Sequence, residues 1–266
     1  MRQIVRPAAV AGSFYPDNPE RLHAQVSGFL QEAQVINNVP KALIVPHAGY
    51  IYSGSIAASA YATLKNQNES INRVVLIGPS HRVPFRGVAT SSATHFSTPL
   101  GKIPIDLQTT QKLERLNCVE PFDQAHSFEH SLEVQLPFLQ ETLNKFSIIP
   151  LVVGDINPEQ LAELIDTIWG GSETLIVISS DLSHYHDYKS AQKMDLATAK
   201  AISALSPSTI NYDDACGRTG VNALLITAKR KGLKVVPLDL RNSGDTAGGR
   251  DQVVGYGSWA FVNPDA

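Results

Sequence analysis

Residues 42–50 read Ala42-Leu43-Ile44-Val45-Pro46-His47-Ala48-Gly49-Tyr50, a short apolar run that ends in a turn containing a histidine. An apolar run of this length, rich in branched aliphatic side chains and closed by Pro, is typical of a strand buried on both faces. Four further runs have the same character, and they are Val74–Ile77, Ile148–Val153, Leu175–Ile178 and Val235–Leu238. The five runs predict a mostly parallel central sheet.

Amphipathic segments separate these runs, so the sequence predicts an α/β protein with helices on both faces of the sheet. The predicted helices are Pro19–Gln34, Ser53–Leu64, a helix from near His126 that carries Leu132, Leu136 and Leu139, then Pro158–Trp169, Lys189–Leu205 and Gly220–Lys231. The alternating stretch Val253–Val262 predicts an edge or antiparallel strand. Because no repeat, low-complexity tract or linker interrupts the pattern, we expect a single domain over residues 1–266.

The composition excludes several classes of protein. The chain has 266 residues, 43% hydrophobic content and a net charge of −3, which is ordinary for a globular protein. The absence of a basic stripe argues against a nucleic-acid partner. No apolar run reaches the ~18 residues that span a bilayer, and the first residues lack the apolar stretch of a signal peptide. We therefore expect a cytoplasmic protein without a membrane partner, whose two cysteines, Cys118 and Cys216, are reduced.

Polar side chains directly follow three of the predicted strands. His47 follows the first, Ser80 and His81 follow the second, and the segment Ser179-Ser180-Asp181-Leu182-Ser183-His184 follows the fourth. A single histidine in such a place is most commonly a hydrogen-bonded turn residue. Ligands of open α/β sheets, however, bind at the carboxyl ends of the strands, where these tails meet. We therefore expect His47, His81, Asp181 and His184 to converge on a functional site.

A metal site is the first chemistry that fits these residues. Two neutral imidazoles and one anionic side chain suit Zn, Cu or Fe, with Asp181 or Cys216 as the third ligand. Cys216 lies just before a predicted helix and close to Arg218, two features that favour a thiolate. From the local sequence alone, a small buried apolar side chain is an equally good interpretation of Cys216.

Two other chemistries are weaker. The segment His126-Ser127-Phe128-Glu129-His130 fits the H-x-x-E-H pattern of inverted zinc proteases, but three fixed positions match by chance often. A plainer interpretation makes Ser127 the N-cap of a helix. Nucleophilic catalysis by Cys216 or by a serine with a histidine base is the other alternative, and adjacent pairs such as Ser80 and His81 rarely have useful geometry.

Taken together, segments along nearly the whole chain resemble the Memo family. The matching segments are Ala11–Pro16, Pro46–Gly54, Gly78–His81, Thr98–Gly101, Glu129–Glu133, Gln135–Pro137, Ile149–Gly154, Ser179–His184 and Cys216–Arg218. Their order along the chain makes this series far more specific than any single motif.

The resemblance implies a fold similar to that of the class III extradiol dioxygenases, whose non-haem iron is held by two histidines and a carboxylate. In Memo proteins a cysteine replaces the carboxylate, so the implied metal ligands are His47, His81 and Cys216. Asp181, His184 and His130 match further pocket residues and are the implied catalytic groups. Iron or copper is the implied metal, with zinc as an alternative.

The resemblance also implies functions and partners. The favoured expectation is a redox-metal protein that acts as an oxidoreductase. The alternatives are a non-catalytic module that binds a phosphopeptide or a partner protein, and, more weakly, a zinc-dependent hydrolase. Microbial members of the family resemble companions of a second small protein and a radical-SAM enzyme, and animal members are linked to peptide binding and cell motility.

Overall fold

The computed structural model describes residues 3–34, 39–67 and 69–264, and within them nine strands form a central sheet in the order β10-β12-β2-β9-β3-β8-β4-β7, with β11 also paired to β12. The bounds of these strands are β2 Pro40–Val45, β3 Arg73–Pro79, β4 Val88–Thr90, β7 Val119–Pro121, β8 Ser147–Val153, β9 Thr174–Ser179, β10 His184–His186, β11 Lys234–Asn242 and β12 Val253–Val262. A second, three-stranded sheet contains β1 Val5–Arg6, β5 His95–Thr98 and β6 Gly101–Pro104.

The centre of the large sheet is parallel, as the sequence predicts. The adjacent strands β2, β9, β3 and β8 all run in one direction and contain four of the five predicted apolar runs. Antiparallel strands extend both margins, with β12 beside β2 and β4 beside β8. The carboxyl ends of β2, β3 and β9 therefore lie side by side, which places the predicted polar tails at one edge.

The fifth apolar run and the last strand differ from the predictions. Val235–Leu238 lies in β11, which pairs with β12 alone and is half-exposed instead of buried on both faces. Val253–Val262 is antiparallel, as predicted, but it is an inner strand with β2 on one side and β10 and β11 on the other. The physical reason is that β12 occupies the place next to β2 and leaves β11 at the margin.

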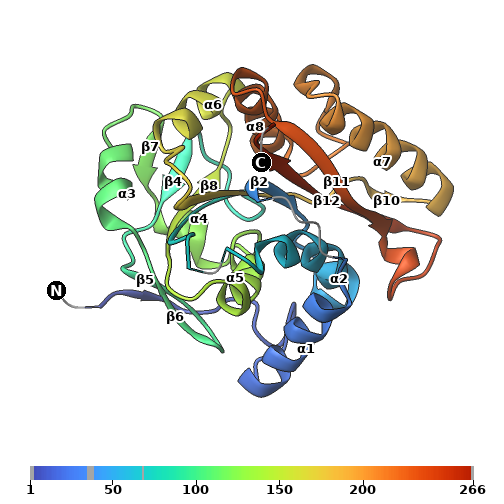
Figure 1. Ribbon diagram of the computed structural model, residues 1–266, viewed down its shortest axis with the longest axis horizontal. Helices are drawn as coiled ribbons and strands as arrows, with labels where there is room; N and C mark the ends of the chain where they lie inside the picture. Colours follow the sequence, from blue (N-terminus) through green and yellow to red (C-terminus); the bar gives the residue numbers. More distant parts are fainter. Residues whose placement is uncertain (1–2, 35–38, 68, 265–266) are drawn as a thin grey trace.

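Helices cover both faces of the sheet (Figure 1). Their bounds are α1 Pro19–Glu32, α2 Tyr50–Tyr61, α3 Leu107–Leu113, α4 Asp123–Ser127, α5 Leu136–Thr142, α6 Pro158–Thr167, α7 Tyr188–Ser203 and α8 Arg218–Arg230, with short 3₁₀ turns η1 Ala62–Leu64, η2 Glu133–Gln135, η3 Pro207–Thr209 and η4 Ser243–Asp245. The buried side chains of α1, α2 and α5 belong to one apolar cluster. Those of α6 and α8 belong to another, on the opposite face.

The predicted long helix from His126 is wrong. The chain forms the short helix α4, turns at Phe128, and becomes helical again only at η2 and α5. Ser127 is the last residue of α4 and not an N-cap. The apolar residues at helical spacing are real, since Leu132, Leu136 and Leu139 are all buried, but they reach the core from two separate elements.

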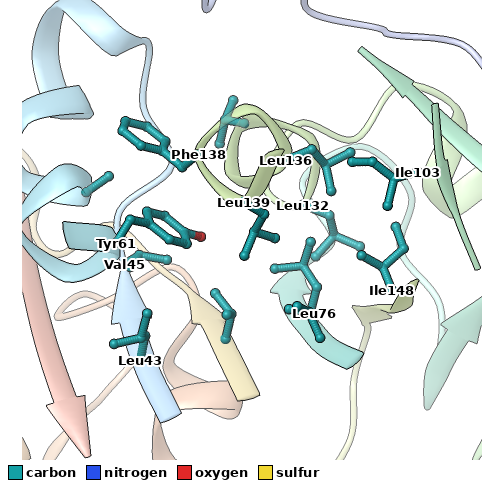
Figure 2. Close-up of a cluster of buried hydrophobic side chains, with 14 of the residues drawn as sticks. Leu43, Val45, Tyr61, Leu76, Ile103, Leu132, Leu136, Phe138, Leu139 and Ile148 are labelled. Carbon is teal, nitrogen blue, oxygen red and sulfur yellow. The ribbon is translucent and has the colours of Figure 1, made fainter. Parts of the chain in front are cut away.

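The larger part of the core lies between the sheet and α5 (Figure 2). Leu43 and Leu76 from the central strands belong to the same cluster of buried apolar side chains as Leu139. Tyr61 stacks on Phe138 with ring centroids 5.2 Å apart, which joins α2 to α5. This packing holds the segment before α5, which carries Glu129 and His130, against the carboxyl edge of the sheet.

A buried ion pair anchors the amino-terminal segment to the same place. The guanidinium of Arg6 contacts the carboxylate of Glu133, and both side chains are almost fully buried. The other oxygen of Glu133 accepts hydrogen bonds from the amide of Val10 and the hydroxyl of Tyr15 at 2.9 and 2.6 Å. Arg6 also donates to the carbonyl oxygen of Glu129 at 2.7 Å. Residues 6–15 are thus fastened to the segment that bears Glu129.

Among the described residues, none of the helices combines the length and the apolar character needed to cross a lipid bilayer.

Candidate metal centre

Three potential metal ligands meet at the carboxyl edge of the sheet. His47 follows β2, His81 follows β3, and Cys216 lies two residues before α8. The Nε2 atom of His47 lies 3.2 Å from the Sγ atom of Cys216, and one ligand atom from each of the three residues lies within 4.8 Å of the others. The rings of His47 and His81 have centroids 5.1 Å apart. Segments far apart in the sequence therefore converge as the predicted parallel edge requires.

These distances fit a metal ion. A metal bonded to nitrogen at ~2.0 Å and to sulfur at ~2.3 Å in tetrahedral geometry places the two ligand atoms ~3.5 Å apart. The observed 3.2 Å between His47 Nε2 and Cys216 Sγ is close to that separation. Two imidazoles and one sulfur also form a donor set suited to copper, iron or zinc. The residues present thus fit the metal that the sequence implies.

The hydrogen bonds of His47 leave its Nε2 atom free to bind a metal. The hydroxyl of Ser179 donates its proton to the carbonyl oxygen of Ser131 at 2.6 Å, so its lone pairs must accept from its other neighbours. Those neighbours are Nδ1 of His47 and the amide of Gln135, each at 2.9 Å. Nδ1 of His47 therefore carries the proton. The unprotonated Nε2 faces Cys216, as a metal ligand requires.

The carboxylate of Glu129 likewise holds the proton of His81 on Nδ1 and leaves Nε2 free. It accepts hydrogen bonds from Nδ1 of His81 at 2.8 Å and from the amide of His81 at 2.6 Å. Burial alone raises the pKa of Glu129, but the hydrogen bonds and the charge of His81 outweigh it and hold the pKa at about 2. Glu129 is therefore ionised, and it fixes both the orientation of the His81 ring and the proton on Nδ1.

His130 lies beside both metal-ligand histidines. Its ring stacks on that of His81 with centroids 4.6 Å apart and meets the ring of His47 edge-on at 5.4 Å. Phe14 covers it, at 4.7 Å between ring centroids. Burial lowers the pKa of His130 to about 4, so the ring is neutral at pH 7. Its Nδ1 is buried without a hydrogen-bond partner in the described residues.

Asp181 lies behind His47 and Cys216. Its carboxylate accepts a hydrogen bond from the amide of His47 at 2.7 Å, and its own amide donates to Sγ of Cys216 at 3.3 Å. Burial raises the pKa of Asp181 to about 7, although the amides of His47 and Ala48 favour the charged form. A carboxyl group with this pKa can hold or release a proton near neutral pH.

Of the two interpretations that the sequence leaves open for Cys216, a thiolate or a buried side chain, the structure without a metal favours the second. Burial, followed by the nearby carboxylate of Asp181, raises the pKa of Cys216 well above its ordinary value, and the start of α8 does not compensate. Without a metal the group is a thiol. The turn that presents it depends on Gly217, because a Cβ atom there would lie 2.6 Å from the carbonyl oxygen of Ser179.

His184 is less closely attached to the centre. It begins β10, is half-buried and pairs with Val254 of β12. Burial lowers its pKa, and the charge of His81 acts in the same direction. Tyr185, the next residue, is largely exposed and has a φ of 61°, a conformation that few non-glycine residues adopt. His184 therefore lies at the outer side of the centre.

The inverted zinc-protease interpretation does not fit the geometry. His126 is in α4, and its Nε2 atom donates to the carbonyl oxygen of Ala89 at 3.1 Å. It packs against Phe96, whereas Glu129 and His130 lie beyond the turn. The hydroxyl of Ser80 donates to the carbonyl oxygen of Val83, so the pair with His81 does not form a nucleophile and base either.

The buried position of His126 predicts an acid-sensitive fold. Burial lowers its pKa from 6.5 to about 4, so the unfolded chain binds a proton that the folded chain excludes as pH falls below 6.5. Burial of the neutral His126 ring therefore costs no stability above pH 6.5, and the free energy of unfolding falls as the pH decreases from 6.5 toward 4. Relative to His126→Gln, whose amide can still donate to Ala89, the wild type should lose roughly 2 kcal/mol between pH 7 and pH 5. Urea unfolding at both pH values measures the difference, and equal pH dependence in the two proteins would refute it.

Sequence reasoning missed two residues that orient the ligands. Ser179 is only one of several polar residues after β9, and Glu129 belongs to a zinc-protease pattern and to a segment that resembles the Memo family, without a role assigned to it. The signal for Ser179 was its position at the end of a central strand. No local signal pairs Glu129 with His81, because the contact joins residues on separate loops.

Comparisons with known proteins point to one family. A family described as "Memo-like protein" matches residues 6–260. A "MEMO1 family protein" of Aquifex aeolicus is 35% identical, over 97% of this chain and 99% of the relative. A "MEMO1 family protein" of Thermoplasma volcanium is 34% identical, over 96% of this chain and 97% of the relative.

A solved structure, the uncharacterized protein JW3007 from Escherichia coli K12, has a similar fold. Its TM-score is 0.51 at 12% sequence identity, and the match covers 82% of this chain and 98% of that one. The similarity concerns the fold alone. From the family match over nearly the whole length and from relatives above 30% identity, we conclude that the chain belongs to the Memo family.

Proposed function

We propose that the protein binds a redox metal, iron or copper, through His47, His81 and Cys216, and that it is an oxidoreductase. The observation that supports this most directly is the arrangement of the two imidazoles. Each has its Nδ1 occupied by a partner from the protein, Ser179 or Glu129, which leaves its Nε2 available, and Nε2 of His47 lies 3.2 Å from the sulfur. Two histidines that only form hydrogen bonds in a core would not both need a bound Nδ1 and a free Nε2.

The bound metal would supply one-electron chemistry, and the thiolate would favour copper or iron over hard cations. The protein's own groups would move protons. Asp181, with a pKa near 7, would take or give a proton beside Cys216, and the thiol must lose its proton when a metal binds. His130 and His184 would contact the substrate as neutral hydrogen-bonding groups.

Cys216 gives the sharpest test of the ligand set. Replacing a soft thiolate by a hydroxyl should weaken copper binding by at least ~100-fold while leaving the histidine pair in place. Competition titrations of wild type and Cys216→Ser with a chromophoric chelator measure this, and Cys118→Ser is the matched control at the second cysteine. Equal copper affinity in Cys216→Ser and wild type would exclude sulfur ligation.

Glu129 should tune the metal through His81. In Glu129→Gln the carboxamide can still accept a hydrogen bond, but the negative charge that makes His81 a better donor is lost. Loss of such a partner costs about 10- to 100-fold in metal affinity. The same chelator competition measures it. Unchanged affinity in this variant would show that Glu129 serves the fold alone.

A non-catalytic binding module is the second candidate, and one observation favours it. Two large apolar side chains beside the centre are exposed, Phe128 at 73% and Tyr185 at 70%. They adjoin Glu129 and His184 in the sequence and would suit a peptide or a companion protein. Calorimetry with phosphopeptides in the presence of a chelator separates the candidates, since binding that is unchanged without metal supports the module.

A further inference from the structure

A cavity of about 250 Å³ reaches Cys216 from the α8 side of the sheet. Its floor is apolar and includes Ile77 and Ile178, which belong to the cluster on the α8 face. His47, His81 and His130 do not line it. Cys216 is therefore the one proposed metal ligand that also lines this cavity, and a molecule in the cavity would lie beside this residue.

The cavity occupies the place in the sheet where ligands are expected on topological grounds. β3 and β8 are neighbouring parallel strands. The chain leads from β3 to β4 at the margin of the same sheet, and from β8 to α6 on the α8 face. Ligands of open α/β sheets bind at the carboxyl ends of the strands. The cavity is lined by the ends of both strands and of β9.

Its polar wall is made of hydrogen-bond donors. The first turn of α8 lines the cavity, and no side chain caps this helix. The amides of Thr219 and Gly220 thus lie at the positive end of a helix. Arg218 contributes separately: its Nε atom is buried and has no hydrogen-bond partner in the part of the chain that the structure describes. Its guanidinium rests on the ring of Tyr212, 5.3 Å from the centroid. A bound anion would offset the positive charge of Arg218, which lines the cavity.

We propose that this cavity binds a small organic carboxylate, with its charged end at Arg218 and the start of α8 and its carbon chain on Ile77 and Ile178. A monoanion fits better than a phosphate dianion, because among the described residues Arg218 is the only cationic one that lines the cavity, and the exposed residue Asp155 also lines it. The binding of the carboxylate does not depend on the proposed function. Its role as a substrate beside the metal does.

Butyrate and butyramide form a matched pair of probes, because they share a shape and differ in charge. Calorimetry on the chelator-treated full-length protein should show butyrate binding at least ~10-fold more tightly than butyramide. Arg218→Gln should lower the affinity for butyrate about 10-fold. Thr219→Trp, which fills the cavity, should abolish binding. Arg230→Gln, an exposed arginine at the other end of the same helix, should leave the affinity within about twofold.

Equal binding of butyrate and butyramide, or an equal effect of Arg218→Gln and Arg230→Gln, would overturn the proposal. So would tight butyrate binding to Thr219→Trp. Copper titration of the same samples keeps this result apart from the proposed function. Copper binding without butyrate binding refutes only the cavity, and butyrate binding without copper binding refutes only the metal centre.

Discussion

The double variant His47→Ala, His81→Ala should purify without bound iron or copper. Removing both imidazoles leaves Cys216 as the only proposed ligand, and a single thiol does not hold either metal against the buffer. We expect the metal content to fall from about one equivalent per chain to below about 0.1. Elemental analysis of protein prepared without chelators, after expression with iron and copper supplied, measures the loss.

A control variant separates loss of the site from loss of the fold. His23 is exposed on α1 and pairs with Glu141, far from the centre in the fold, so His23→Ala should retain full metal content. Circular dichroism of the double variant should show the wild-type helix content, since its two histidines contribute polar contacts and little apolar burial. The same metal content in the double variant and in His23→Ala would remove the proposed centre.

Glu133→Ala should be the most destabilising single substitution among the buried polar residues near the site. It leaves the Arg6 guanidinium buried without its carboxylate, and it removes the acceptor of the amides of Ala9 and Val10 and of the hydroxyl of Tyr15. Removing one partner of a buried ion pair costs about 3–5 kcal/mol. Urea unfolding of wild type and variant at pH 7 measures the difference.

The surface pair of Arg230 and Asp166 is the matched control, because both side chains are partly exposed. Asp166→Ala should cost no more than about 1 kcal/mol. Glu133→Leu combined with Arg6→Met should recover part of the loss seen in Glu133→Ala, since no uncompensated charge then stays buried. If Glu133→Ala and Asp166→Ala unfold at the same urea concentration, Glu133 does not anchor the amino-terminal segment.

The sequence predicted the parallel part of the sheet because those strands are buried on both faces and carry a continuous apolar signal. Val235–Leu238 carries the same signal in a half-exposed strand, so composition alone could not separate a central strand from a marginal one. The helix predicted from His126 was wrong for a related reason. The break lies at Phe128, between His126 and Leu132, and it accompanies tertiary contacts such as those of Arg6 with His126 and Glu129.

The candidate ligands could be found because each lies at a chain position that the fold brings to one edge. His47 follows β2 and His81 follows β3, two strands of the parallel core. Their convergence at one edge could be predicted from their positions after these strands. Cys216 does not follow a strand, and only the resemblance to the Memo family assigned it. The sequence left its protonation open, because a helix start favours a thiolate whereas burial, which the sequence does not display, favours the thiol and has the larger effect.

X-ray absorption at the metal edge of copper-loaded protein tests the central claim most directly, because it reads the atoms bonded to the metal. The account predicts one sulfur and two imidazole nitrogens around copper in the wild type, and no sulfur in Cys216→Ser. A wild-type spectrum with nitrogen and oxygen neighbours alone would contradict it.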